Sequence, residues 1–221
     1  MLRSALAFSQ FLSKDIIFSN GPKVSGKELI FEKEEDVYSP DISKTIIEKG
    51  ITTIVYNIPS QNLFEGLKGY IKSVSNLVIE QFSDSELDLS SYQLYNLKSI
   101  TIPETITTIG SACFRNWAIT SIDLKNVNSV QYAAFANCIY LETIKAPLLT
   151  SIPSGFASGC YSLSSLTTGS ITSIDYSAFM NCYKLTSIDL TGVTTISDSA
   201  FANSGIESIG CPKVRLAQRS I

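Results

Sequence analysis

Histidine is absent from the 221 residues of this chain, and tryptophan occurs only once. Without histidine, neither a Ser–His nor a Cys–His pair can form, and such pairs activate the nucleophiles of many hydrolases. Glycine-rich phosphate loops are absent too, because Gly66, Gly69 and Gly110 do not fit the GxGxxG or the P-loop spacing. We therefore expect that the chain is not an enzyme and that it uses no cofactor.

Charge is scarce in the second half of the chain. The whole sequence has 17 basic and 20 acidic residues, but residues 97–205 contain only 5 basic and 6 acidic side chains. Nucleic-acid-binding proteins neutralise several phosphates with clustered Lys and Arg. The small basic group at the C-terminus, Lys213, Arg215 and Arg219, is better interpreted as a solvated end. We expect no nucleic-acid partner.

Long apolar runs are missing as well. No segment approaches the roughly 18 consecutive apolar residues that a membrane-spanning helix needs, so we expect no membrane insertion. The N-terminal residues include one Arg and a short apolar run, which Ser9 and Gln10 interrupt. This run is too short for the core of a signal peptide, and we expect it to belong to the mature protein.

The five cysteines are odd in number and include no Cys-x-x-Cys pair. Three of them, Cys138, Cys160 and Cys182, are spaced 22 residues apart. A structural zinc site usually needs four converging Cys or His ligands, which this spacing does not supply. We expect a column of small buried thiols rather than a metal site or a disulfide.

Six segments share the pattern Leu-x-x-Ile-x-Ile or a close variant of it. They begin at Leu97, Ile119, Leu141, Leu163, Leu185 and Ile206, with separations of 22, 22, 22, 22 and 21 residues. Two degenerate copies begin earlier, at Ile51 and Val74, with a spacing of 23 residues. A fixed period of about 20–50 residues is typical of solenoids and propellers. The repeat predicts an α/β solenoid with parallel strands in a column on one face.

A second motif, Ala-Phe-x-Asn-Cys or a variant of it, recurs in the other half of the repeats. Its phenylalanines are Phe114, Phe135, Phe179 and Phe201. The third repeat is irregular, because Phe156 follows Ile152 one residue early and the chain then gains one residue. We expect a single α or 3₁₀ turn at each motif, with each Phe stacked on the Phe of the next coil. The Asn suits the bend because it tolerates left-handed backbone geometry.

The first 50 residues lack this repeat. Residues 2–12 have helical spacing, and the apolar runs at residues 16–18 and 29–31 flank a turn-rich loop that predicts a hairpin. Such a hairpin would cover the open first coil of the solenoid.

Two longer helices are also predicted before the regular repeats. The first begins at residues 39–41, ends at Gly50 and buries Ile42, Ile46 and Ile47. The second covers residues 60–71. We divide the chain into a cap or attachment segment (1–50), degenerate repeats (51–96), regular repeats (97–211) and a tail (212–221).

Residues 97–117 resemble the BspA-like (Treponema pallidum-type) leucine-rich repeats, with Leu-x-x-Ile-x-Ile-Pro followed by x-x-Ile-x-x-Ile-Gly. The resemblance covers residues 97–212 well and residues 51–96 weakly. It implies a right-handed leucine-rich-repeat solenoid with short helical turns opposite the strands. It also implies adhesion or protein–protein recognition at a cell surface. Related repeats occur in phage structural proteins.

Alternate strand residues point away from the core, which defines two outward columns. The main members of the first column are Ser99, Ser121, Thr143, Ser165 and Ser187, and it extends to Thr53, Asn76 and Ser208. The main members of the second column are Thr101, Asp123, Lys145, Thr167 and Asp189, and it extends to Val55, Val78 and Gly210. These columns form either a docking face for a protein or glycan or an ordinary solvated strand surface. Asp123 and Asp189 are three coils apart, about 15 Å, which does not suit a catalytic pair.

Aromatic residues offer a second surface. Tyr132, Tyr140, Tyr161, Tyr176 and Tyr183 lie in the other half of the coils, where they either contact a partner or pack along the wall of the solenoid. We expect Trp117 to fill the junction between degenerate and regular coils.

Two functions are compatible with these observations. The first is a non-enzymatic interaction module for adhesion or protein recognition. The second is a structural subunit of a larger assembly, such as a virion fibre or decoration, attached through its first 30 or so residues. The second would involve a homo-oligomer or a larger assembly.

Overall fold

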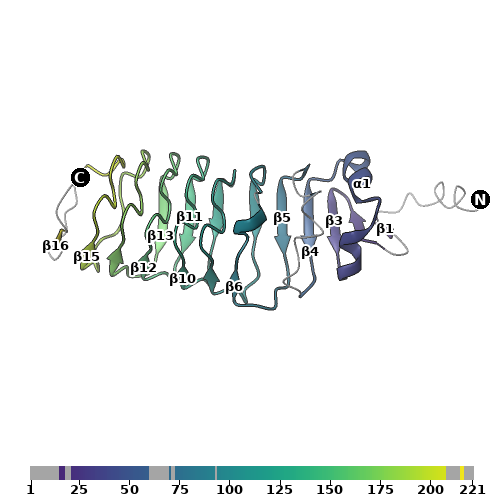
Figure 1. Cartoon of the computed structure of the whole chain (residues 1–221), viewed down its shortest axis with the longest axis horizontal. Coiled ribbons are helices and arrows are strands. Elements are labelled where there is room, and N and C mark those ends of the chain that lie inside the picture. The colour runs from purple at the N-terminus through teal and green to yellow at the C-terminus, as the bar shows by residue number, and fades with distance from the viewer. Residues whose placement is uncertain are drawn as a thin grey trace, which may run out of the picture.

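The computed structural model describes residues 15–17, 21–59, 70, 73–92, 94–207 and 215–216. For residues 15–17, 34 and 215–216 only the backbone is described. Figure 1 shows an elongated stack of coils, with β3 and α1 near one end and β15 near the other. The helices predicted over residues 2–12 and 60–71 lie outside the described residues, apart from Tyr70.

The predicted column of parallel strands is confirmed. A six-stranded sheet runs β1 (Asp15–Ile17), β2 (Lys23–Ser25), β3 (Glu28–Phe31), β4 (Thr53–Tyr56), β5 (Asn76–Ile79) and β7 (Ser99–Thr101). From β3 to β7 all pairs are parallel. A second parallel sheet continues the column with β9 (Ser121–Asp123), β11 (Thr143–Ala146) and β13 (Ser165–Thr168). The fold is therefore the expected leucine-rich-repeat solenoid.

A second ladder of two-residue strands, which the sequence analysis did not anticipate, runs beside the first. β6 (Glu86–Leu87), β8 (Thr108–Ile109) and β10 (Ser129–Val130) are parallel neighbours. β12 (Ser151–Ile152), β14 (Ser173–Ile174), β15 (Thr195–Ile196) and β16 (Arg215–Leu216) form the next group. In each two-residue strand whose side chains are described, the first residue is polar and more exposed, and the second is aliphatic and buried. A pair of residues is therefore enough to extend the ladder.

The N-terminal prediction of one hairpin is wrong. β2 lies within the predicted loop and pairs antiparallel with both β1 and β3, so the segment is a three-stranded meander. Val24 is buried between the half-buried Lys23 and Ser25, and this alternation is a strand signal that the neighbouring turn residues concealed. Gly26, with φ of 59°, makes the tight turn into β3.

The helix that follows is confirmed in place but not in its buried face. A 3₁₀ helix, η1 (Glu34–Tyr38), precedes α1 (Ile42–Lys49), which ends at the left-handed Gly50. The buried residues of α1 are Ile42, Thr45 and Ile46, whereas Ile47 is 77% exposed. Positions three and four residues apart share a helix face, and Ile47 falls outside it. A further 3₁₀ turn is η4 (Ser90–Tyr92). No helix among the described residues is long and apolar enough to cross a membrane.

The wall opposite the strands is built from tight turns. In these turns, every second N–H group donates to the carbonyl three residues earlier, as at Cys113, Arg115 and Trp117. The N–H groups between them donate to the next coil, as at Ala112, Phe114 and Asn116. Two positions per coil have left-handed backbone, one at φ of 51–65° (Ala112, Ala133, Gly155, Ser177 and Ser199) and one at 56–77° (Asn116, Asn137, Gly159, Asn181 and Asn203). The 3₁₀-type bond therefore forms but cannot continue into a helix.

The file of stacked phenylalanine rings is confirmed. Successive ring centroids from Phe114 through Phe135, Phe156 and Phe179 to Phe201 are 5.3, 5.3, 5.8 and 5.5 Å apart. These rings belong to one continuous core of buried apolar residues that also contains the strand residues facing inward. Each coil therefore covers the apolar face of its neighbour, which is how a solenoid is stabilised.

The irregular third repeat keeps the backbone register of the others. Phe135 N donates to the carbonyl of Phe156, which therefore occupies the position that Ala holds in the other coils. Ala157 occupies the position of the phenylalanine, because its N donates to Ala178 O. The chain neither loses nor gains a residue here; instead Phe156 and Ala157 have exchanged places. The ring of Phe156 still enters the file, and it meets both neighbours edge to face, at 72° and 71°.

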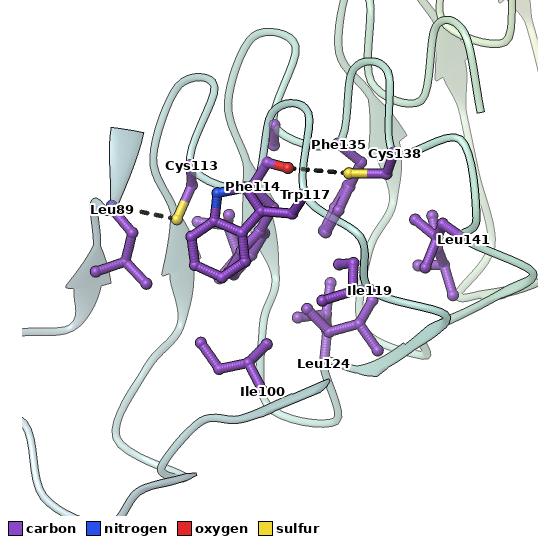
Figure 2. Packing of buried hydrophobic residues seen from close by; sticks show 14 of the residues in the cluster. Leu89, Ile100, Cys113, Phe114, Trp117, Ile119, Leu124, Phe135, Cys138 and Leu141 are labelled. Atoms are coloured by element: carbon purple, nitrogen blue, oxygen red, sulfur yellow. Dashed lines mark hydrogen bonds between the residues drawn. The ribbon is translucent and has the colours of Figure 1, made fainter. Parts of the chain in front are cut away.

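The thiol column and the indole are both buried, and Figure 2 shows Cys138 and Trp117 among the packed side chains. Cys138, Cys160 and Cys182 each donate their S–H to a carbonyl of the preceding coil, at 2.9, 3.1 and 3.1 Å. Trp117 is 2% exposed and meets Phe114 edge to face at 5.1 Å. The predictions of a buried thiol column and of a space-filling Trp117 are confirmed.

Candidate binding surface

The strand column places most of the predicted site residues side by side. In the register of β9, β11 and β13, Ser121 lies beside Thr143 and then Ser165, while Asp123 lies beside Lys145 and then Thr167. Adjacent strands are about 4.8 Å apart. All of these side chains are exposed except Thr143, which is half-buried. We call the outward side chains of β7, β9, β11 and β13 the strand face.

The last predicted members of the columns are not part of this ladder. Ser187 and Asp189 are exposed but lie outside any strand, and Ser208 and Gly210 lie outside the described residues. Asp189 accepts hydrogen bonds from the N–H and the hydroxyl of Thr191, at 2.9 and 2.6 Å. These bonds lower the pKa of Asp189, so its carboxylate closes its own turn.

The first coils differ from the polar columns that the sequence predicted. Val55 was expected to point into solvent but is only 6% exposed. It lies between Ile30 and Val78, which are half-buried, and branched side chains on adjacent strands cover one another. In the other column, Ser99 donates to Asn76 at 2.7 Å, and Asn76 donates to Thr53 at 3.3 Å.

A groove of about 580 Å³ opens between β7 and β9. Its apolar lining includes Val78, Ile100, Ile102, Ile106 and Val127. Its polar lining consists of Glu80, Thr101, Glu104, Asp123, Lys125 and Asn126. Two of the predicted site residues, Thr101 and Asp123, thus lie at one concave site, which we call the β7–β9 groove.

The groove lies where the strand column is interrupted. β7 is the last strand of the first sheet and β9 belongs to the next sheet, although Thr120 N still donates to Lys98 O at 3.2 Å. After β9, Leu124 N donates forward to Lys145 O at 2.7 Å, away from β7. Pro103, which follows β7, has no N–H, but the N–H at this repeat position donates to the preceding coil, as Glu80 N does to Tyr56 O, so the proline removes a bond toward β5 and not toward β9.

One core position confirms that the coils separate here. Leu124 and Ala146 are completely buried, whereas Ile102, at the same position of its coil, is only partly buried and lines the groove. Some apolar surface is therefore accessible beside the charged rim. The repeat spacing changes from 23 to 22 residues at this junction.

One ion pair joins two residues at the rim of the groove. The Lys125 ammonium donates to the Glu104 carboxylate, and both side chains are largely exposed. This hydrogen bond and the charge of Lys125 lower the pKa of Glu104, while the same bond and the charge of Glu104 raise the pKa of Lys125. Asn126 donates to Glu104 O at 3.0 Å. These contacts fix one side of the rim.

The tyrosines form a separate exposed surface on the turn wall. Tyr132, Tyr140, Tyr161, Tyr176 and Tyr183 are 45–61% exposed. Tyr161 and Tyr183 stack with ring centroids 5.3 Å apart and planes inclined by 28°. Each of these two rings therefore covers one face of the other.

The buried thiols are poor nucleophiles. Burial raises the pKa of Cys182 to about 12, and it also raises the pKa values of Cys113 and Cys160. A thiol reacts as its thiolate, so these side chains are inert at neutral pH. Within the described part of the chain, no group of three or more His, Cys, Asp or Glu side chains is placed to hold a metal ion.

Solved structures with similar coils come from bacteria. A leucine-rich repeat protein from Bacteroides ovatus ATCC 8483 aligns with a TM-score of 0.58 and 17% identity, over 91% of this chain and 58% of its own. A leucine rich cell surface protein from Faecalibacterium prausnitzii A2-165 aligns with a TM-score of 0.49 and 21% identity, over 89% of this chain and 47% of its own. The chain thus spans about half the length of these proteins. No curated protein matches it.

The repeat region itself matches a family model. The BspA type leucine rich repeat region matches in 6 copies over residues 60–138 and 113–217. These residues include every coil from β5 onward. Because the match covers well over half of the sequence, this chain belongs to the BspA-type leucine-rich repeat family.

Proposed function

We propose that the chain is a non-enzymatic recognition module that binds a protein partner through the strand face. The observation that carries this proposal is the register of β9, β11 and β13, which holds exposed polar side chains in two straight columns. A partner meets a surface whose backbone is already ordered. Such preorganisation reduces the entropy that is lost on binding.

The chemistry of the strand face suits a protein surface. Ser121, Thr143 and Ser165 have short side chains with few rotamers to lose, and each hydroxyl can donate and accept. Asp123 and Lys145 add one charge of each sign on neighbouring strands. Within the described chain, no side-chain hydrogen bond is recorded for these three hydroxyls, so they are open to a partner.

Family membership supports a role in protein–protein contact, and we propose that the contact takes place at a cell surface. The solenoid supplies a long, stiff scaffold on which an extended binding face is displayed. The turn wall serves mainly to close the coils, since its alternate N–H groups and its Phe file hold neighbouring coils together.

The test uses ligands selected from a random 12-residue peptide library displayed on phage and panned against the purified chain. Binding of the enriched peptides is compared between the native chain and Asp123→Ser/Lys145→Ser. The matched control is Asp175→Ser/Lys184→Ser, which removes the same two charges from exposed positions outside the strand face.

We expect the strand-face variant to lose about fivefold or more in affinity, because each rim charge contributes up to about 1 kcal/mol. The control variant should bind as the native chain does, and both should keep the native melting temperature. Equal binding by the strand-face variant and the native chain would remove this face as the site.

A further inference from the structure

We infer that the β7–β9 groove receives a basic side chain from an extended segment of the partner protein, with an aliphatic residue of that segment lying beside it. This inference rests on the proposed function, because it names the part of the strand face that provides most of the specificity. It commits to a peptide segment with the order aliphatic–any residue–basic.

The size and lining of the groove suit such a segment. Its volume of about 580 Å³ falls within the range of roughly 300–1,000 Å³ that is usual for ligand sites. The floor contains Ile100, Ile102 and Val127, which can contact the methylene stem of a lysine or arginine. The half-buried Ile102 is the part of this floor that a partner would cover.

The charge of the rim selects a cation. Glu80, Glu104 and Asp123 supply three carboxylates around the groove, against the single ammonium of Lys125. Lys125 is already paired with Glu104. Within the described residues, neither Glu80 nor Asp123 forms an ion pair. Lys145 lies beside Asp123 in register, but three carboxylates still face two ammonium groups, so the net charge around the groove is negative.

An apolar row leads into the groove and gives the line along which the segment would lie. Ile30, Val55 and Val78 are neighbours in register across β3, β4 and β5, and the next member of the row is Thr101 at the groove. From Val78 to Thr101 the row covers one strand spacing, about 4.8 Å, and alternate residues of an extended peptide, which point to the same face, are about 6.7 Å apart. An aliphatic side chain can therefore lie against Val78 while the basic side chain two residues further on enters the groove.

The inference is tested with two synthetic peptides labelled with a fluorophore and titrated with the full chain by fluorescence anisotropy. The basic probe is Ac-Ile-Ser-Ile-Ser-Arg-Ser-NH2, and the acidic probe carries Glu in place of Arg. The groove is filled by Thr101→Trp, and the matched control is Thr167→Trp. Both threonines are exposed, and both lie in the same outward column of the strand face.

The basic probe should bind at least about tenfold more tightly than the acidic probe at low salt, and this ratio should fall when the salt concentration is raised. Thr101→Trp should reduce binding of the basic probe about tenfold, whereas Thr167→Trp should leave it unchanged. Asp123→Asn should weaken it by about threefold, as expected for one exposed charge.

The results separate the groove from the strand face as a whole. Equal binding of the two probes, no binding of either, or equal effects of the two Trp variants would overturn the groove as a cation site. If the library-selected peptides still depend on Asp123 and Lys145 in that case, the proposed function stands without the groove. If the basic probe depends on Thr101 while the selected peptides ignore Lys145, the groove stands and the wider strand face is rejected.

Discussion

Removal of an interior phenylalanine ring, that of Phe135, is the sharpest test of how the coils are held together. Phe135 is fully buried and has a ring neighbour on each side, Phe114 and Phe156, both at 5.3 Å. Phe135→Ala leaves a cavity between coils whose backbones are hydrogen-bonded to each other. Because these coils cannot collapse freely, we expect a loss of about 4 kcal/mol in the free energy of unfolding, in the middle of the usual range for Phe→Ala.

The matched control is the last ring of the file. Phe201 is 6% exposed and has one ring neighbour among the described residues, Phe179 at 5.5 Å. Its position can relax more easily, so Phe201→Ala should cost about half as much, near 2 kcal/mol. A one-dimensional stack also predicts that the interior change weakens the contact between the coils on either side of Phe135, whereas the terminal change frays one end.

The assay is urea denaturation followed by two signals. Far-UV circular dichroism reports the whole solenoid, and Trp117, the only tryptophan, reports the coil next to Phe135. Phe135→Ala should lower the midpoint of the tryptophan transition, whereas Phe201→Ala should leave that midpoint nearly unchanged while the dichroism transition broadens. Equal losses in the two variants, or a loss below about 2 kcal/mol for Phe135→Ala, would refute the reasoning.

Two further predictions concern the turn wall and the thiol column. Gly159→Ala should cost about 2 kcal/mol, because φ is +77° and the new Cβ would lie 2.3 Å from Asn137 Oδ1. Gly155→Ala should cost about 1 kcal/mol or less, because the nearest atom is 3.5 Å away and other coils carry Ala at this left-handed position; equal urea midpoints for the two variants would contradict this. Burial raises the pKa of Cys182 from 9.0 to about 12, so the unfolded thiol ionises first and stability falls as pH rises from about 9 to 12. Relative to Cys182→Ala, the native chain should therefore lose about 1.4 kcal/mol between pH 7 and pH 10, and parallel pH curves for the two proteins would contradict it.

The regular features of the fold were predictable because they recur. A residue type repeated at a constant interval in a solenoid occupies the same place in every coil. The strand register, the thiol column and the ring file all follow from that rule. Even the left-handed Asn positions were expected from their place before the Cys column.

Features that depend on a single coil were not predictable. From the sequence alone, the exchange of Phe156 and Ala157 predicts a shift of the backbone, because a repeat pattern gives the order of the residues but not the direction in which each side chain points. The backbone bonds of Gly155 and Ala157 to Tyr176 and Ala178 show that the register is unchanged. The ring still reaches the file from the neighbouring position.

The β7–β9 groove was missed for a related reason. Thr101 and Asp123 were identified as outward residues, but the groove also needs Glu80, Glu104 and Lys125, which lie in the turns that follow the strands. Their meeting depends on a strand pair that fails to form, and no local pattern encodes that failure. A proline after the strand is not sufficient, since Pro147 stands at the position of Pro103 in a coil where β11 and β13 remain paired.

The most direct measurement of the central claim is amide chemical-shift mapping of the ¹⁵N-labelled chain with a library-selected peptide bound. If the strand face is the recognition surface, the largest shifts fall in β7, β9 and β11 and in the turns that line the groove, including Glu104 and Lys125. Shifts centred instead on the exposed tyrosines of the turn wall, such as Tyr132, Tyr161 and Tyr183, with the strands unaffected, would contradict the account.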